Sequence, residues 1–104
     1  MMKYVIAYRG GRKFESPQDG AAYMAKWKAW MGSVGAAMVD PGMPLGNGKL
    51  IGPAGVTDRG ADRLTGFSMV DAESLEAAVA LARQCPHLEH GTIEVAEAME
   101  MKMR

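Results

Sequence analysis

The residues of this chain that could do chemistry gather in one short segment near its carboxyl end. Both histidines, His87 and His90, and the only cysteine, Cys85, lie within it. In the order Cys-x-His-x2-His they could offer a thiolate and two imidazoles to a zinc ion. A fourth ligand is not evident, and Cys85 also continues the apolar stripe of a predicted helix. We therefore predict no metal site, and we expect Cys85 to be buried as a small apolar residue.

The two histidines leave two interpretations open. One of them could cap the end of the preceding helix, where an imidazolium cation interacts favourably with the negative end of the helix dipole. Alternatively, His87 or His90 could line a pocket as a general base or a hydrogen-bond donor. On the second interpretation, both are candidate catalytic residues.

A carboxylate elsewhere in the chain is the third candidate catalytic residue. Asp40 ends a predicted short strand and is followed by Pro41 and Gly42. An aspartate at such a place commonly forms a turn by accepting a hydrogen bond from the backbone two residues further on. The functional alternative is a carboxylate at the mouth of a cleft, because this strand end leads into a long glycine-rich segment.

Four residues are candidates for ligand binding. Tyr8 and Arg9 end the first predicted strand, and Arg9 could hold an anionic ligand or form an ion pair on the surface. Trp27 and Trp30 lie on the apolar stripe of the first predicted helix. Their rings could pack between helix and sheet, or one ring could line a cavity or a subunit contact.

Two helices are predicted from their boundary residues. Ser16 suits the amino-terminal cap of the first helix, Pro17 suits its first position, and Gly35 suits a left-handed stop. The second helix is expected to end at Cys85, because Pro86 restricts the residue before it to an extended conformation.

Four strands are predicted from β-branched, aromatic and alternating residues. They cover Lys3–Arg9, Ala36–Asp40, Arg63–Asp71 and Thr92 to about Met101. Residues 41–62 are rich in glycine and predict a long loop or a ragged hairpin, with a short strand at Lys49–Ile51. A loop of this length in a compact domain is usually a functional lid or mobile.

The order of these elements predicts an α+β fold of the ferredoxin-like type, βαββαβ. Two helices then cover one face of a four-stranded antiparallel sheet. The first strand is apolar on both faces, with Tyr4 and Ile6 on one and Val5 and Ala7 on the other. Because an exposed apolar face is unfavourable, we expect a second copy of the chain to cover it, giving a homodimer.

Length and composition limit the classes of function. The 104 residues predict one domain, spanning 1–104. Equal numbers of acidic and basic side chains, without a basic stripe, make nucleic acid a poor partner. No apolar run approaches the ~20 residues that span a bilayer, and a lone cysteine fits a reducing, cytoplasmic setting. We predict no cofactor, since Gly46–Lys49 lacks the spacing of a phosphate-binding loop.

Several segments of the chain match a family pattern, and the most specific are Trp27–Met31 and the corner Cys85–Gly91. The others are Met2–Val5, Tyr8–Gly11, Gly35, Val39–Gly42 and Leu64–Phe67. Together they resemble the YCII-related family, in the branch that contains the DGPF proteins, over nearly the whole chain. The resemblance implies a dimeric α+β barrel, in which two ferredoxin-like units place their sheets face to face.

The chain departs from the family pattern at two places. Met24 stands where better-known members carry a histidine that pairs with an aspartate in a proposed catalytic dyad, and Gly52–Asp58 stands where the branch has Asp-Gly-Pro-Phe. The acid–base role of that dyad is therefore not carried over to this chain. Some relatives are linked to the dehalogenation of aromatic compounds.

Two hypotheses of function follow. The first is a binding protein without turnover, which holds a small molecule in a cleft between helices and sheet or near the dimer interface. The second is a cofactor-independent enzyme of lyase, dehalogenase or hydrolase type, which acts on a small aromatic compound through Asp40 with His87 or His90. The absent helix histidine favours the first hypothesis.

Overall fold

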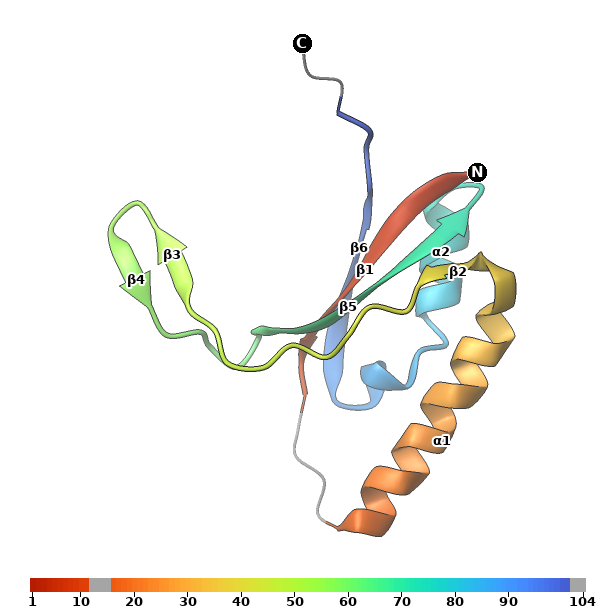
Figure 1. Cartoon of the computed structure of the whole chain (residues 1–104), viewed down its shortest axis with the longest axis horizontal. Coiled ribbons are helices and arrows are strands. Elements are labelled where there is room, and N and C mark those ends of the chain that lie inside the picture. Colours follow the sequence, from red (N-terminus) through yellow and green to blue (C-terminus); the bar gives the residue numbers. More distant parts are fainter. Residues whose placement is uncertain (12–15, 102–104) are drawn as a thin grey trace.

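The computed structural model describes residues 1–11 and 16–101, and its main feature is a four-stranded antiparallel sheet (Figure 1). The strands are β1 (Met2–Gly10), β2 (Met38–Asp40), β5 (Leu64–Ala72) and β6 (Gly91–Glu97), in the order β2-β5-β1-β6. The helices are α1 (Pro17–Val34) and α2 (Leu75–Ala82), with short 3-10 helices η1 (Gly35–Ala37) and η2 (Pro86–Glu89). This arrangement confirms the predicted α+β, ferredoxin-like fold.

The boundaries of α1 agree with the prediction. The Ser16 hydroxyl oxygen accepts a hydrogen bond from the Asp19 backbone N–H at 3.1 Å, and Pro17 occupies the first turn. At the other end Gly35 has φ 61°, a conformation that side chains rarely adopt, and it ends the helix. α1 is therefore fixed in length at both ends by local chemistry.

The second helix is shorter than predicted. It ends at Ala82 instead of Cys85, and Cys85 is extended with ψ 133°, as a residue before proline prefers to be. Cys85 is nevertheless buried with Ala78 and Ala82, whereas Leu75 and Val79 are exposed. The buried face of α2 is therefore narrower than predicted, and Cys85 adds to the same core from outside the helix.

Two strands also differ from their predicted lengths. β2 begins at Met38, because residues 35–37 form the 3-10 turn η1 that completes the exit from α1. β6 ends at Glu97, which pairs with Tyr4 near the start of β1, so further residues of β6 have almost no strand left beside them. Met99 and Met101 are consequently exposed.

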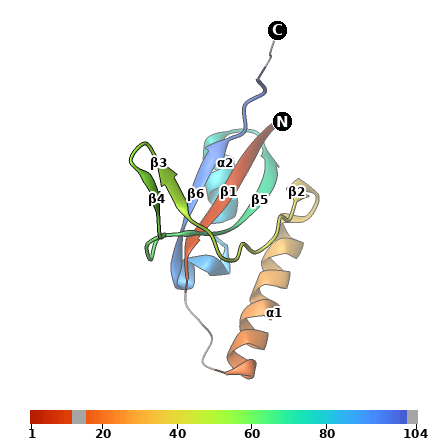
Figure 2. The same ribbon diagram turned by 60° about the vertical axis from the view of Figure 1, so that its left-hand side comes forward.

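Residues 41–62 contain a hairpin and an anchored stretch. The hairpin strands β3 (Leu50–Gly52) and β4 (Gly55–Thr57) project to one side of the sheet and α1 lies on the other (Figures 1 and 2). Before the hairpin, the chain is held along β5, because the Leu45 N–H donates to the Thr65 carbonyl at 3.0 Å. Gly42 is required there, since a Cβ atom on it would overlap the Phe67 carbonyl. Residues 41–45 therefore extend the edge of the sheet.

The core lies between the sheet and the helices. Tyr4, Ile6 and Val70 are almost completely buried on the helix-facing side of the strands. Trp30 of α1 is 4% exposed, and its indole Nε1–H donates to the Leu81 carbonyl at 3.0 Å. This side chain joins α1 to α2, because it supplies both apolar burial and a hydrogen bond.

We expect Trp30→Ala to lower the free energy of unfolding by about 3–5 kcal/mol, since it removes a large buried ring from the core. Trp30→Phe keeps most of the apolar volume but loses the hydrogen bond and part of the ring, so its cost should be smaller. Urea unfolding followed by circular dichroism measures both. A loss below about 1 kcal/mol for Trp30→Ala would show that the ring does not join the helices.

Burial raises the pKa of the Cys85 thiol to about 11, and a hydrogen bond from the His87 backbone opposes this rise only in part. The folded pKa is above the unfolded value, so the stabilising contribution is full below about pH 9 and is lost as pH rises through 11. Between about pH 8 and pH 11 the wild type should lose up to about 2 kcal/mol more stability than Cys85→Ala. Urea unfolding of both proteins at the two pH values measures this difference, and parallel curves would contradict it.

Candidate functional site

A cleft of about 670 Å³ opens between α1, the carboxyl end of β1 and the anchored stretch 41–45. Six of its lining residues carry aromatic rings, namely Tyr8, Tyr23, Trp27, Phe67, His87 and His90. The remaining lining includes three methionines, Met24, Met31 and Met43. A cleft of this size with apolar walls and a few polar groups is typical of small-molecule sites.

The rings of the cleft pack against one another mainly edge to face. Trp27 lies edge-on to Tyr8, with ring centroids 5.1 Å apart, and Tyr23 lies edge-on to Trp27 at 6.2 Å. Tyr23 also contacts His90, at 4.8 Å between centroids. Contacts of this geometry are favourable beyond the area that they bury, so the aromatic wall is held in place by its own members.

His87 is 6% exposed and is oriented by the backbone of β1. Its Nε2 atom lies 2.8 Å from the Arg9 carbonyl oxygen, and because a carbonyl only accepts, Nε2 carries the hydrogen. The neighbouring Gly91 makes this contact available, since a Cβ atom there would overlap both the imidazole and the Arg9 carbonyl. The structure therefore assigns His87 to the end of β1, and not to the end of α2, where we considered a capping role.

The Tyr8 hydroxyl is held in place by a buried hydrogen bond. Its hydroxyl donates to the Ser68 hydroxyl at 2.8 Å, and Ser68 donates in turn to the Pro41 carbonyl at 2.8 Å. Burial raises the pKa of the Tyr8 phenol above its ordinary range, and the Ser68 hydrogen bond opposes this rise only in part. Tyr8 thus stays a neutral phenol at physiological pH, fixed between β1, β5 and residue 41.

Four of the seven predicted site residues meet at this cleft. They are Tyr8 and Trp27, predicted to bind a ligand, and His87 and His90, predicted as catalytic candidates. His87 contacts both Tyr8 and His90, with ring centroids 5.4 and 5.8 Å apart. Residues from β1, α1 and η2 therefore converge, although they are far apart in the sequence.

The other three predicted residues lie elsewhere. Asp40 is exposed, and its carboxylate accepts from the Gly42 N–H at 2.8 Å, which is the turn-forming alternative. The Arg9 side chain pairs with Asp62 at 3.4 Å and with Glu94 at 3.6 Å, which is the surface alternative. Only the backbone carbonyl of Arg9 reaches toward the cleft, through His87.

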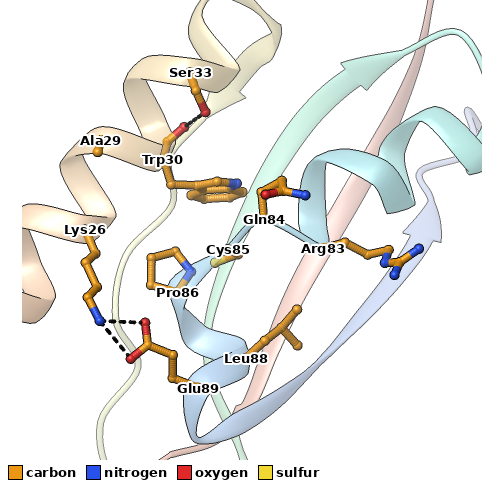
Figure 3. Close-up of a pocket in the computed structure, with 10 residues that line it drawn as sticks. All are labelled: Lys26, Ala29, Trp30, Ser33, Arg83, Gln84, Cys85, Pro86, Leu88 and Glu89. Carbon is orange, nitrogen blue, oxygen red and sulfur yellow. Dashed lines mark hydrogen bonds and ion pairs between the residues drawn. The ribbon is translucent and has the colours of Figure 1, made fainter.

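Trp30 lines a second hollow, a groove of about 840 Å³ between α1 and η2 (Figure 3). One end of this groove is closed by the ion pair of Lys26 with Glu89, at 3.1 Å, and its middle holds Trp30 beside Pro86 and Cys85. Neither histidine lines it. We therefore take the cleft, and not the groove, as the candidate site.

From the sequence, the methionines are interpreted as packing residues, with a methionine-lined pocket as the alternative, and Thr65 is not predicted to contact a ligand. Met24, Trp27 and Met31 follow one another at the spacing of a single helix face, which was the available signal. Thr65 carried no signal, because its place in the cleft depends on how β5 pairs with β1. Its hydroxyl lies 2.9 Å from the Gly10 carbonyl and 3.2 Å from the Tyr8 carbonyl.

Among the described residues there is neither a metal-binding cluster nor a membrane-spanning helix. Within residues 1–11 and 16–101, no three side chains of the histidine, cysteine, aspartate or glutamate type are placed to hold a metal ion. Over the same part of the chain, neither helix combines the length and the apolar character needed to cross a membrane.

Comparison with known proteins agrees with the fold. A solved structure of 5-chloro-2-hydroxyhydroquinone dehydrochlorinase from Burkholderia phenoliruptrix AC1100, in complex with 2,5-dihydroxybenzoquinone, matches with a TM-score of 0.61. It is 22% identical, and the match covers 96% of each chain. No curated protein matches the sequence. The family model of the YCII-related domain matches residues 2–102, so this chain belongs to the YCII-related domain family.

Proposed function

We propose that this protein binds a small aromatic molecule in the cleft between α1 and the sheet. The observation that carries the proposal is the convergence of Tyr8, Trp27, His87 and His90 on one hollow of about 670 Å³. Aromatic edges and thioethers favour a flat, apolar ligand, and the buried polar groups orient it. The similar dehydrochlorinase was solved with a quinone bound, which supports a ring-shaped ligand for this chain as well.

A second candidate function is cofactor-independent turnover of such a ligand, and His87 favours it. Its Nε2–H is committed to the Arg9 carbonyl, so in the neutral imidazole Nδ1 is the basic nitrogen. Asp40, proposed as its partner, faces its own turn. The enzymatic alternative therefore depends on His87 and His90. Chloride release from a chlorinated hydroquinone that His87→Asn abolishes would favour this alternative, whereas unchanged recovery of the compound favours binding alone.

Trp27→Ala should weaken the binding of phenol by about tenfold, since it removes the ring that packs between Tyr8 and Tyr23. NMR titration of ¹⁵N-labelled protein measures the affinity. Arg83→Ala is the control, because Arg83 lines the groove and not the cleft, so its substitution should leave phenol affinity unchanged. Equal affinities for the wild type and Trp27→Ala would argue against this cleft as the site.

We further propose that the protein is a homodimer formed through the sheet face opposite the helices. On that face Met69, Val5 and Ala96 lie side by side across β5, β1 and β6, and Ala7 is paired with Phe67. Charged residues of both signs flank this apolar row, which suits a self-complementary interface. An interface near the standard ~1,600 Å² would cover it. We also propose that the protein is cytoplasmic and that it does not bind nucleic acid.

Val5→Asp should convert the dimer to a monomer, because it places a carboxylate in the middle of the apolar row. Light scattering at micromolar concentration measures the mass. Ala25→Asp introduces the same charge on an exposed position of α1 and should leave the dimer intact. A wild-type protein that is monomeric at micromolar concentration would remove the proposal.

A further inference from the structure

We propose that the cleft selects ligands by a neutral hydroxyl group, so that a phenol binds in preference to the matching ether or carboxylate. This inference rests on the proposed binding function and adds the class of polar group that the ligand must carry. It depends on where the hydrogens of the cleft's own polar groups point. Three such groups can be assigned from their partners, namely Tyr8, Thr65 and His87.

The direction of the Tyr8 hydroxyl hydrogen follows from two successive hydrogen bonds, the second of which ends on a backbone carbonyl. The Pro41 carbonyl can only accept, so the Ser68 hydroxyl, 2.8 Å away, points its hydrogen there. Ser68, 2% exposed, then has only lone pairs to offer Tyr8, whose hydroxyl lies at 2.8 Å and donates to it. The Tyr8 oxygen therefore keeps a lone pair but no free hydrogen, in a side chain that lines the cleft.

The hydrogens of Thr65 and His87 also point to backbone carbonyls. The Thr65 hydroxyl has two backbone carbonyls within reach, those of Gly10 at 2.9 Å and Tyr8 at 3.2 Å, so its single hydrogen points to the backbone. The His87 Nε2–H points to the Arg9 carbonyl at 2.8 Å, which leaves Nδ1 as an acceptor in the neutral ring. Three polar groups of the lining therefore have lone pairs, and not hydrogens, available for a ligand.

The three polar groups whose hydrogens can be assigned only accept from a ligand, so they distinguish ligands by whether these bring a hydrogen-bond donor. A phenolic hydroxyl supplies the missing hydrogen, whereas an ether oxygen of nearly the same shape brings only lone pairs. Sites whose buried polar groups are left unpaired reject the wrong analogue strongly. A carboxylate is repelled further, because its charge meets the same lone pairs. Arg63 is the cation among the described lining residues, but it is exposed at the rim, where ion pairs contribute little.

The test compares phenol, anisole and benzoate by NMR titration of the wild type at neutral pH. Phenol should bind at least about tenfold more tightly than anisole, and benzoate should bind most weakly. Tyr8→Phe removes one acceptor, so the phenol-to-anisole ratio should fall toward one. Ser68→Ala frees the Tyr8 hydrogen to turn toward the ligand, so the ratio should fall there too. Should either variant fail to fold, the three wild-type affinities decide.

Each outcome bears on one proposal or on both. Equal binding of phenol and anisole, with chemical-shift changes at the cleft, would overturn the hydroxyl selection and leave the binding function standing. The tightest binding by benzoate would overturn the selection as well, in favour of Arg63. If none of the three compounds changes the spectrum at the cleft, both the binding function and the selection fail.

Discussion

The contact between the His87 imidazole and the Arg9 carbonyl is the interaction on which the candidate site depends. It joins the end of β1 to η2, two parts of the chain that are 78 residues apart. Because it buries the imidazole against a backbone group, it fixes the tautomer and the ring plane at once. Gly91 is its structural condition, since any side chain at that position would occupy the same space. The corner Cys85–Gly91 thus places His87 against the end of β1.

The sequence was sufficient for the fold because its boundary residues act locally. Ser16, Pro17 and Gly35 determine α1 through a cap, a fixed φ and a positive φ, none of which requires knowledge of the rest of the chain. Pro86 was a weaker guide. It restricts Cys85 to an extended conformation, but it does not determine that the helix ends three residues earlier, where turn hydrogen bonds replace the helical ones.

The candidate site was harder to predict for a related reason. Tyr8 and Arg9 are neighbours in a strand, so alternation sends their side chains to opposite faces, one to the cleft and one to the surface. Trp27 and Trp30 are three apart on one helix, yet one faces the cleft and the other the groove. Alternation separates Tyr8 from Arg9 but does not tell which face borders the cleft. Residue type could not separate the two tryptophans, because the difference lies in which neighbours surround each ring.

The sheet separates binding from the proposed assembly, and β1 is common to both. Its helix-facing residues reach the core and the cleft, whereas Val5 and Ala7 lie on the open face. A partner on that face would leave the α1 and η2 walls of the cleft uncovered, although Phe67 both lines the cleft and pairs with Ala7. Arg9 is a further exception to this separation, since its carbonyl holds His87 while its side chain pairs with Glu94 on the open face. In the proposed dimer, a change in how the two large sheets meet would therefore reach the cleft through residues such as Arg9 and Phe67.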